Sequence, residues 1–150
     1  MIFISHRGLL SGPDRFLENK PSQIEKALDL GFDVELDIYV IDKNVYLGHD
    51  QPDTLISPNW LEDKKERLWI HCKNLAAIEY LYGSNFNYFW HENDLVTLTS
   101  RGYIWAYPGN QPIKNSIAVL PEIHHEDVSD ALGVCTDYPE KYMNMKGYKL

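Results

Sequence analysis

Short apolar runs alternate with short amphipathic segments along the whole chain, a pattern typical of α/β proteins. Apolar runs at 2–5, 32–40 and 68–72 predict buried strands. A helix is expected to begin at Pro21, because proline favours the first helical position, and to end at Gly31. The remaining expected elements are a turn at 42–44 with a return strand at 45–47, strands at 87–90, 103–106, 117–120 and 132–135, and helices at 75–82 and 138–142.

The predicted strands form one main sheet of about seven strands, and several are joined without a full helix between them. Segment 107–116 contains two prolines and a glycine, so no helix fits there, and only a short helical or irregular piece is expected between 90 and 103. A (β/α) barrel usually needs about 250 residues, whereas this chain has 150. We therefore predict a single α/β domain over residues 1–150, an abbreviated TIM-type (β/α) barrel with some helices missing. An open α/β sandwich is the alternative.

Charge and composition argue against some kinds of binding partner. The formal net charge is −8, which disfavours non-specific binding to nucleic acid or to anionic membranes. No apolar run is long enough to span a bilayer, and the first residues lack a basic region and a cleavage site, so we expect a cytoplasmic protein. Cys72 and Cys135 lie far apart without metal-binding spacing, so both are expected to be buried and unpaired.

Two histidines follow predicted strands and are candidates for proton transfer. His6 and Arg7 end the first strand, which places an acid–base group beside a guanidinium that can bind an anion. His49 follows the return strand. Displacement at phosphorus needs one group to take a proton from the nucleophile and another to protonate the leaving oxygen. Each residue taken singly is an ordinary strand-end or surface side chain.

The second strand carries two acids on an otherwise apolar sequence. Glu35 and Asp37 are two residues apart, so both project from the same face of the strand. Two neighbouring carboxylates repel each other and are costly to bury, and a divalent cation removes both problems. The alternatives are that this face is solvated, or that the acids pair with Arg7 or Lys73.

Taken together, these motifs resemble the glycerophosphodiester phosphodiesterase family. That family opens with histidine-arginine-glycine and an acid-asparagine pair, continues with a helix that ends in glycine, and then has a Glu-x-Asp strand, a hairpin and a His-Asp. The matching residues here are His6-Arg7-Gly8, Glu18-Asn19, the helix 21–30 with Gly31, Glu35-x-Asp37, the turn 42–44 and His49-Asp50. The likeness covers residues 2–50, with a weaker echo of the family's last strand at 133–139.

The resemblance implies a barrel with its site at the C-terminal ends of the strands. It assigns acid–base catalysis to His6 and His49, phosphate binding to Arg7 and Lys73, and metal binding to Glu35 and Asp37. The implied reaction is metal-dependent hydrolysis of a small glycerophosphodiester, a step of lipid metabolism. The attacking group is either water or a neighbouring hydroxyl of the substrate, which would give a cyclic phosphate.

One position departs from the family pattern. The next strand of the family normally supplies Glu-x-Lys, and the related sphingomyelinase D toxins have an aspartate there, whereas this chain has His71 before Lys73. As a third ligand, His71 would favour manganese or zinc; without it, magnesium or calcium is expected. His71 and the short length favour a non-catalytic phosphate- or phosphodiester-binding module as the alternative function. The presence of both His6 and His49 favours an enzyme.

Other polar and aromatic residues have weaker claims to a role. His91, at the end of the predicted strand 87–90, is expected to cap an element or to lie on the surface, and the alternative is that it faces the same site. His124 is expected in a solvated loop. Trp105 is the aromatic residue most suited to form a pocket wall. Asp137 is expected either near the site or as the cap of the last helix.

Overall fold

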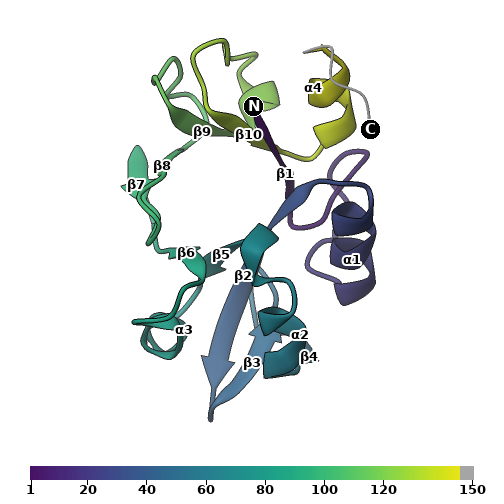
Figure 1. Ribbon diagram of the computed structural model, residues 1–150, viewed down its shortest axis with the longest axis vertical. Helices are drawn as coiled ribbons and strands as arrows, with labels where there is room; N and C mark the ends of the chain where they lie inside the picture. The colour runs from purple at the N-terminus through teal and green to yellow at the C-terminus, as the bar shows by residue number, and fades with distance from the viewer. Residues whose placement is uncertain (146–150) are drawn as a thin grey trace.

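The computed structural model describes residues 1–145 as one curled sheet with helices on its outside (Figure 1). The strands are β1 (Ile2–His6), β2 (Asp33–Ile41), β3 (Asn44–Leu47), β4 (Thr54–Ile56), β5 (Leu68–Cys72), β6 (Asn87–Phe89), β7 (Val96–Leu98), β8 (Ile104–Ala106), β9 (Ser116–Val119) and β10 (Gly133–Thr136). The α-helices are α1 (Pro21–Asp29), α2 (Pro58–Glu62), α3 (Leu75–Leu81) and α4 (Pro139–Met145). Short 3-10 turns lie at Lys65–Arg67 and Pro121–Ile123.

A run of parallel strands makes most of the sheet, in the order β6-β5-β2-β1-β10-β9-β8. The antiparallel β3 and β4 extend from the far end of β2, and the antiparallel β7 pairs with β8. In Figure 1 the sheet curls until β7 faces β6. The α/β prediction is therefore confirmed, and the curled sheet with few helices is compatible with an abbreviated barrel.

The ring closes between β6 and β7 without a strand ladder among the described residues. The backbone N–H of Ser100 donates to the carbonyl of Tyr88 at 2.8 Å, and the N–H of Tyr88 donates to Oγ of Ser100 at 3.0 Å. The Thr97 hydroxyl donates to the carbonyl of Trp90 at 3.1 Å. Side-chain hydrogen bonds thus replace part of the backbone pairing that joins neighbouring strands elsewhere in the sheet.

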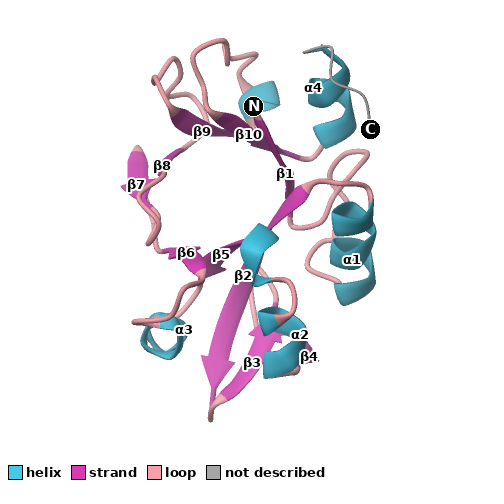
Figure 2. Cartoon of the chain, in the orientation of Figure 1, coloured by secondary structure: helices cyan, strands magenta, loops and turns pink. Residues whose placement is uncertain are grey.

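Successive side chains along each strand point to opposite faces of the sheet, so each face has its own apolar cluster. Val34, Leu36 and Ile38 of β2 belong to the core that includes buried residues of α1 and α3. Trp69 and Trp105 belong to a second apolar cluster, which fills the inside of the curled sheet. Figure 2 shows α1, α3 and α4 outside the ring, whereas none of the described helices lies outside β7 and β8.

Two parts of the fold differ from the sequence prediction. The segment expected to be helical or irregular contains the strand β7, and the hairpin continues into β4 and α2, which were not predicted. In β7, Val96 and Leu98 are exposed on the uncovered outer face, so the strand lacks the buried run by which strands are recognised. Both cysteines are buried and unpaired, as expected. None of the described helices has the length and apolar character that crossing a membrane requires.

Candidate active site

The ends of three neighbouring strands bring acidic and basic side chains together. In the β1–β2 ladder His6 lies opposite Glu35, and in the β2–β5 ladder Asp37 lies opposite His71. Residues paired in parallel ladders project from the same face, so these side chains share the inside of the curled sheet. Lys73 follows His71 by two residues and takes the same side.

A cavity of about 290 Å³ opens at this edge of the sheet. Six of the seven predicted site residues line it: His6, Arg7, Glu35, His49, His71 and Lys73. The seventh, Asp37, has no exposed surface and contacts Arg7 and His71. The predicted site residues, which are spread between positions 6 and 73 of the sequence, therefore lie in or beside one cavity at the C-terminal ends of the strands.

Glu35, Asp37 and His71 form a buried group that could hold a metal ion. One ligand atom from each lies within 4.8 Å of the others. Oδ1 of Asp37 is buried and makes no well-aligned hydrogen bond, although Nδ1 of His71 is 3.0 Å away and Nζ of Lys73 is 3.7 Å away. Two carboxylates and one imidazole suit a divalent cation, with nitrogen favouring manganese or zinc and oxygen favouring magnesium or calcium.

Asp37 is held as an anion by its neighbours. Burial by itself would raise its pKa, but the nearby imidazole of His71 and the positive charges of Arg7 and Lys73 lower that pKa far below its ordinary value. Asn19 fixes the side chain and backbone of Asp37 together. The Asn19 amide donates to Oδ2 at 2.9 Å, while its oxygen accepts from the N–H of Asp37 at 3.0 Å. Asn19 belongs to the motif at 18–19, yet its positioning role was not predicted.

Glu35 has the opposite character. Burial and the negative charge of Asp37 raise the pKa of Glu35 above its ordinary value, against the charges of His6 and Arg7. Its Oε2 accepts the backbone N–H of Arg7 at 3.2 Å and lies 4.0 Å from Nε2 of His6. Asp37 is therefore stabilised as an anion, whereas the positive charges around Glu35 are too few to stabilise its anion fully.

Both candidate acid–base histidines are held by an aspartate. Nδ1 of His6 lies 2.7 Å from Oδ1 of Asp137, and Nδ1 of His49 lies 2.7 Å from Oδ1 of Asp50. Burial opposes a charge on His6, but Asp137 and Glu35 outweigh it and raise its pKa. Burial and the charge of Arg7 lower the pKa of His49. Each ring thus keeps Nε2 free of its aspartate.

Arg7 and Lys73 supply the positive charge of the cavity. The backbone of Arg7 is left-handed, with φ 53°. Its Nη1 donates to Oε2 of Glu18 at 2.9 Å, and its Nε is 3.1 Å from Oδ2 of Asp37. Burial opposes the charge of Arg7, but Asp37 and Glu35 raise its pKa. The alternative that the acids pair with Arg7 and Lys73 is thus correct for Asp37, and it coexists with the metal-ligand geometry.

His91 lines the cavity, so the expected capping or surface role is wrong. Its ring stacks on His71 at 4.5 Å between centroids, and Tyr107 meets it edge-on at 4.2 Å. Burial and the charge of His71 lower the pKa of His91 to about 4. Its position two residues after the inward Phe89 was the signal that could have placed it inside. Trp105 lines the same cavity, as expected of a pocket wall.

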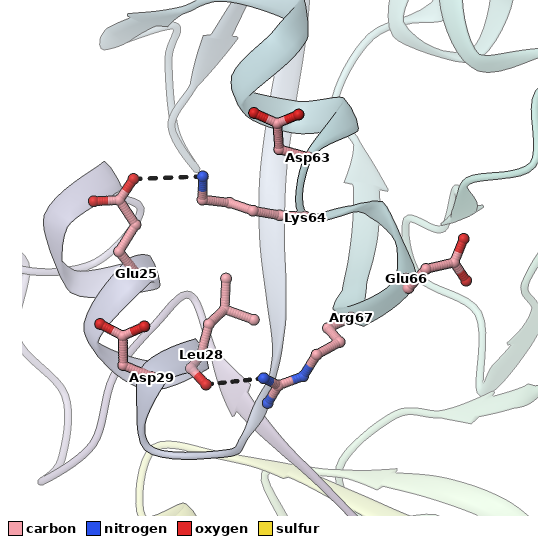
Figure 3. Close-up of a pocket in the computed structure, with 7 residues that line it drawn as sticks. All are labelled: Glu25, Leu28, Asp29, Asp63, Lys64, Glu66 and Arg67. Carbon is pink, nitrogen blue, oxygen red and sulfur yellow. Dashed lines mark hydrogen bonds and ion pairs between the residues drawn. The ribbon is translucent and has the colours of Figure 1, made fainter.

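A second hollow of about 480 Å³ lies outside the sheet, between α1 and the turn after α2 (Figure 3). Its basic residues are already engaged. Lys64 reaches to 3.5 Å from Glu25, and Nη1 of Arg67 donates to the carbonyl of Leu28 at 2.9 Å. Unlike the cavity inside the sheet, this hollow has no histidine among its described lining residues.

Comparison of the chain with protein-family models and with curated proteins finds no match. The arrangement of the side chains in the cavity is therefore the basis for assigning a function.

Proposed function

We propose that this chain is a divalent-cation-dependent phosphodiesterase, a short and divergent relative of the glycerophosphodiester phosphodiesterases, acting on a diester with a small alcohol. One observation carries the proposal. Two histidines, His6 and His49, each with Nδ1 held by an aspartate, line a single cavity beside a buried group that could hold a metal ion. Binding a phosphate alone would not need two oriented imidazoles.

The ligand set would be Glu35, Asp37 and His71. A divalent cation bound there would neutralise phosphate charge and help to orient the attacking oxygen. The buried, unsatisfied Oδ1 of Asp37 and the raised pKa of Glu35 both support a site built for additional positive charge. Lys73, which lines the cavity, would share the negative charge that develops on the phosphate oxygens.

Proton transfer would fall to the two histidines. One Nε2 takes the proton of the attacking hydroxyl as the new P–O bond forms, and the other gives a proton to the leaving oxygen as the old P–O bond breaks. With water as the attacker, the products are a phosphomonoester and an alcohol. With a neighbouring hydroxyl of the substrate, they are a cyclic phosphate and an alcohol. Asp137 and Asp50 would keep each ring in the required orientation.

The test is hydrolysis of bis(p-nitrophenyl) phosphate by chelator-treated protein to which magnesium, calcium, manganese or zinc is returned. We expect cation-dependent release of nitrophenol that falls by at least about 10²-fold in His6→Ala and in His49→Ala, the loss typical of a missing acid or base. His124→Ala removes an exposed histidine and serves as the matched control. Phosphodiester binding without turnover under every metal would contradict catalysis and favour the binding-module alternative.

A further inference from the structure

His49 lines two hollows at once. One is the cavity inside the sheet, and the other is an outer groove of about 470 Å³ between the 15–20 segment and the 48–53 loop. We infer that this groove binds the second alcohol of the diester, so that the preferred substrate joins a small alcohol, held in the cavity, to a larger polyhydroxy ring such as a sugar or a cyclitol. This inference rests on the proposed function.

The sizes of the two hollows support this division. The inner cavity, about 290 Å³, is at the lower end of the roughly 300–1,000 Å³ that ligand pockets occupy. It has room for a phosphate and one small alcohol, and Trp105 and Val119 wall it. A phosphodiester has two alcohol arms, so the second arm has to leave past a cavity residue. His49, one-third exposed, is the residue that the cavity shares with the groove.

The groove is polar, but most of its charges are already paired. Lys20 is bonded to Asp53, and the carboxylate of Glu18 accepts from Arg7. Asp50 accepts from His49. This internal pairing leaves Arg15 as the one lining cation without an ion pair among the described residues, so the groove carries little excess charge and favours a neutral, hydrogen-bonding arm.

Two exposed polar side chains in the groove remain free to bind hydroxyl groups. Arg15 and Gln51 make no hydrogen bond or ion pair with another side chain in the described part of the chain. Both carry several N–H donors, and Gln51 adds a carbonyl acceptor. Hydroxyl groups of a polyol both donate and accept, so they match this set.

An aromatic ring stands at the edge of the same groove. Phe16 is 88% exposed, although a phenyl ring gains free energy from burial. The backbone that carries it is held in place, because Oδ1 of Asp14 accepts the backbone N–H groups of Phe16 and Leu17 at 2.8 and 3.3 Å. A flat apolar ring beside hydrogen-bonding groups fits the face of a cyclic polyol, which is apolar on its C–H side.

The opposite wall of the groove is also rigid. Gly48 has φ 150°, and a Cβ there would lie 2.1 Å from the carbonyl oxygen of Gln51. Only glycine allows the 48–53 loop to fold back so tightly. The groove is therefore formed before any ligand binds.

The test compares two diesters that share a glycerol arm and differ in the other, glycerophosphoglycerol and glycerophosphoinositol. We expect a higher kcat/KM for the inositol diester. Phe16→Ala and Arg15→Ala should raise KM for that diester by about 3- to 10-fold, the equivalent of one ring or polar contact, with kcat and the smaller diester unaffected. Tyr82→Ala, which removes an 82%-exposed aromatic ring outside both hollows, is the matched control.

Binding separates failure of this inference from failure of the proposed function. Amide resonances of wild-type protein are followed during titration with glycerophosphoinositol. Shifts at 15–17 and 51, weakened in Phe16→Ala, support the groove even when no diester is hydrolysed, in which case only the catalytic proposal fails. Hydrolysis without such shifts, or with equal effects of Phe16→Ala on both diesters, overturns the groove and leaves the catalytic proposal standing. Neither hydrolysis nor shifts overturns both.

Discussion

Nδ1 of His6 lies 2.7 Å from Oδ1 of Asp137, although 131 positions separate the two residues in the chain. The contact exists because β1 pairs in parallel with β10, with Ser5 opposite Thr136 at the end of the ladder. The ends of the first and last strands thus bring the two residues of this contact together. The candidate site is complete only when the chain has closed on itself.

The first prediction concerns Asp137→Asn. The amide can still accept a hydrogen bond from His6 but lacks the negative charge that, with Glu35, raises the pKa of His6. We expect the pKa of His6 to fall and phosphodiesterase activity to drop by roughly 10²- to 10⁴-fold. Imidazole proton resonances followed against pH in metal-free protein measure the first effect, and kcat measures the second. An unchanged pKa of His6 would contradict this account.

The same contact makes stability depend on pH in a definite direction. A histidine whose pKa is raised on folding stabilises the fold fully below its unfolded value, about 6.5, and loses that contribution as pH rises through its folded value. Asp137→Asn should therefore cost more stability at pH 5 than at pH 8. Urea denaturation of metal-free wild type and variant at both pH values measures this difference. A larger cost at pH 8 would show that another interaction of Asp137 dominates.

Glu35 and Asp37 are expected to respond in opposite ways to the loss of charge. Glu35→Gln removes a buried group whose pKa is raised, so the metal-free protein should be no less stable at neutral pH. Asp37→Asn removes the anion that Arg7, His71 and Lys73 surround, which should cost on the order of 3 kcal/mol. Denaturant titration of the two metal-free variants is the measurement.

Both variants should bind a divalent cation more weakly than wild type, since each loses a charged ligand. Calorimetric titration with manganese measures this. Equal stability losses in the two variants, or cation affinity that neither variant changes, would contradict the different roles given to the two acids.

His71 is the position at which a metal ligand and a hydrogen-bond partner of Asp37 have to be told apart. If His71 ligates, His71→Gln should weaken manganese or zinc binding by at least about tenfold, and His71→Glu should shift preference towards magnesium or calcium. His91→Gln is the matched control, because its ring stacks on His71 but is not one of the clustered ligands. Unchanged affinity in His71→Gln would leave His71 only as a partner of Asp37.

Asn19 offers a test of positioning without any change of charge. Asn19→Ala removes both hydrogen bonds that fix Asp37 and leaves a buried N–H without an acceptor. A loss of stability of about 2 kcal/mol is expected, together with weaker cation binding. Asn44→Ala, at the exposed first residue of β3, whose side chain makes one long hydrogen bond of 3.4 Å, is the control. Full cation affinity in Asn19→Ala would remove Asn19 from the site.

Local periodicity was sufficient to place the acidic strand and its neighbour. The spacing of Glu35 from Asp37, and of His71 from Lys73, already put each pair on one face, and the structure has them there. Asp137 and His91 could not be placed in the same way. The contact of Asp137 depends on the closure of β10 against β1, and the orientation of His91 depends on the curl of the sheet beyond β6.

In the fold, too, local sequence patterns predicted some elements, and others depend on contacts between distant segments. Strands with buried runs were predicted to within a few residues, whereas β7 was not, because its outer residues face no helix. The number of strands in a ring and the place where it closes depend on contacts between distant segments. Neither is encoded in the alternation of any one strand.

The closure through Ser100 and Tyr88 gives the ring one weak side. Between the other neighbouring strands described, a ladder of backbone bonds has to break before two strands separate, but at this seam three contacts involve side-chain hydroxyls. Local opening should therefore be least costly there, and the amide of Tyr88 should exchange with deuterium sooner than that of Ile4 in the centre of the β1 ladder. Ser100→Ala should speed exchange at Tyr88 and leave Ile4 unchanged. A curled sheet with such a seam can open locally on one side while the strands that carry its charged cluster stay in register.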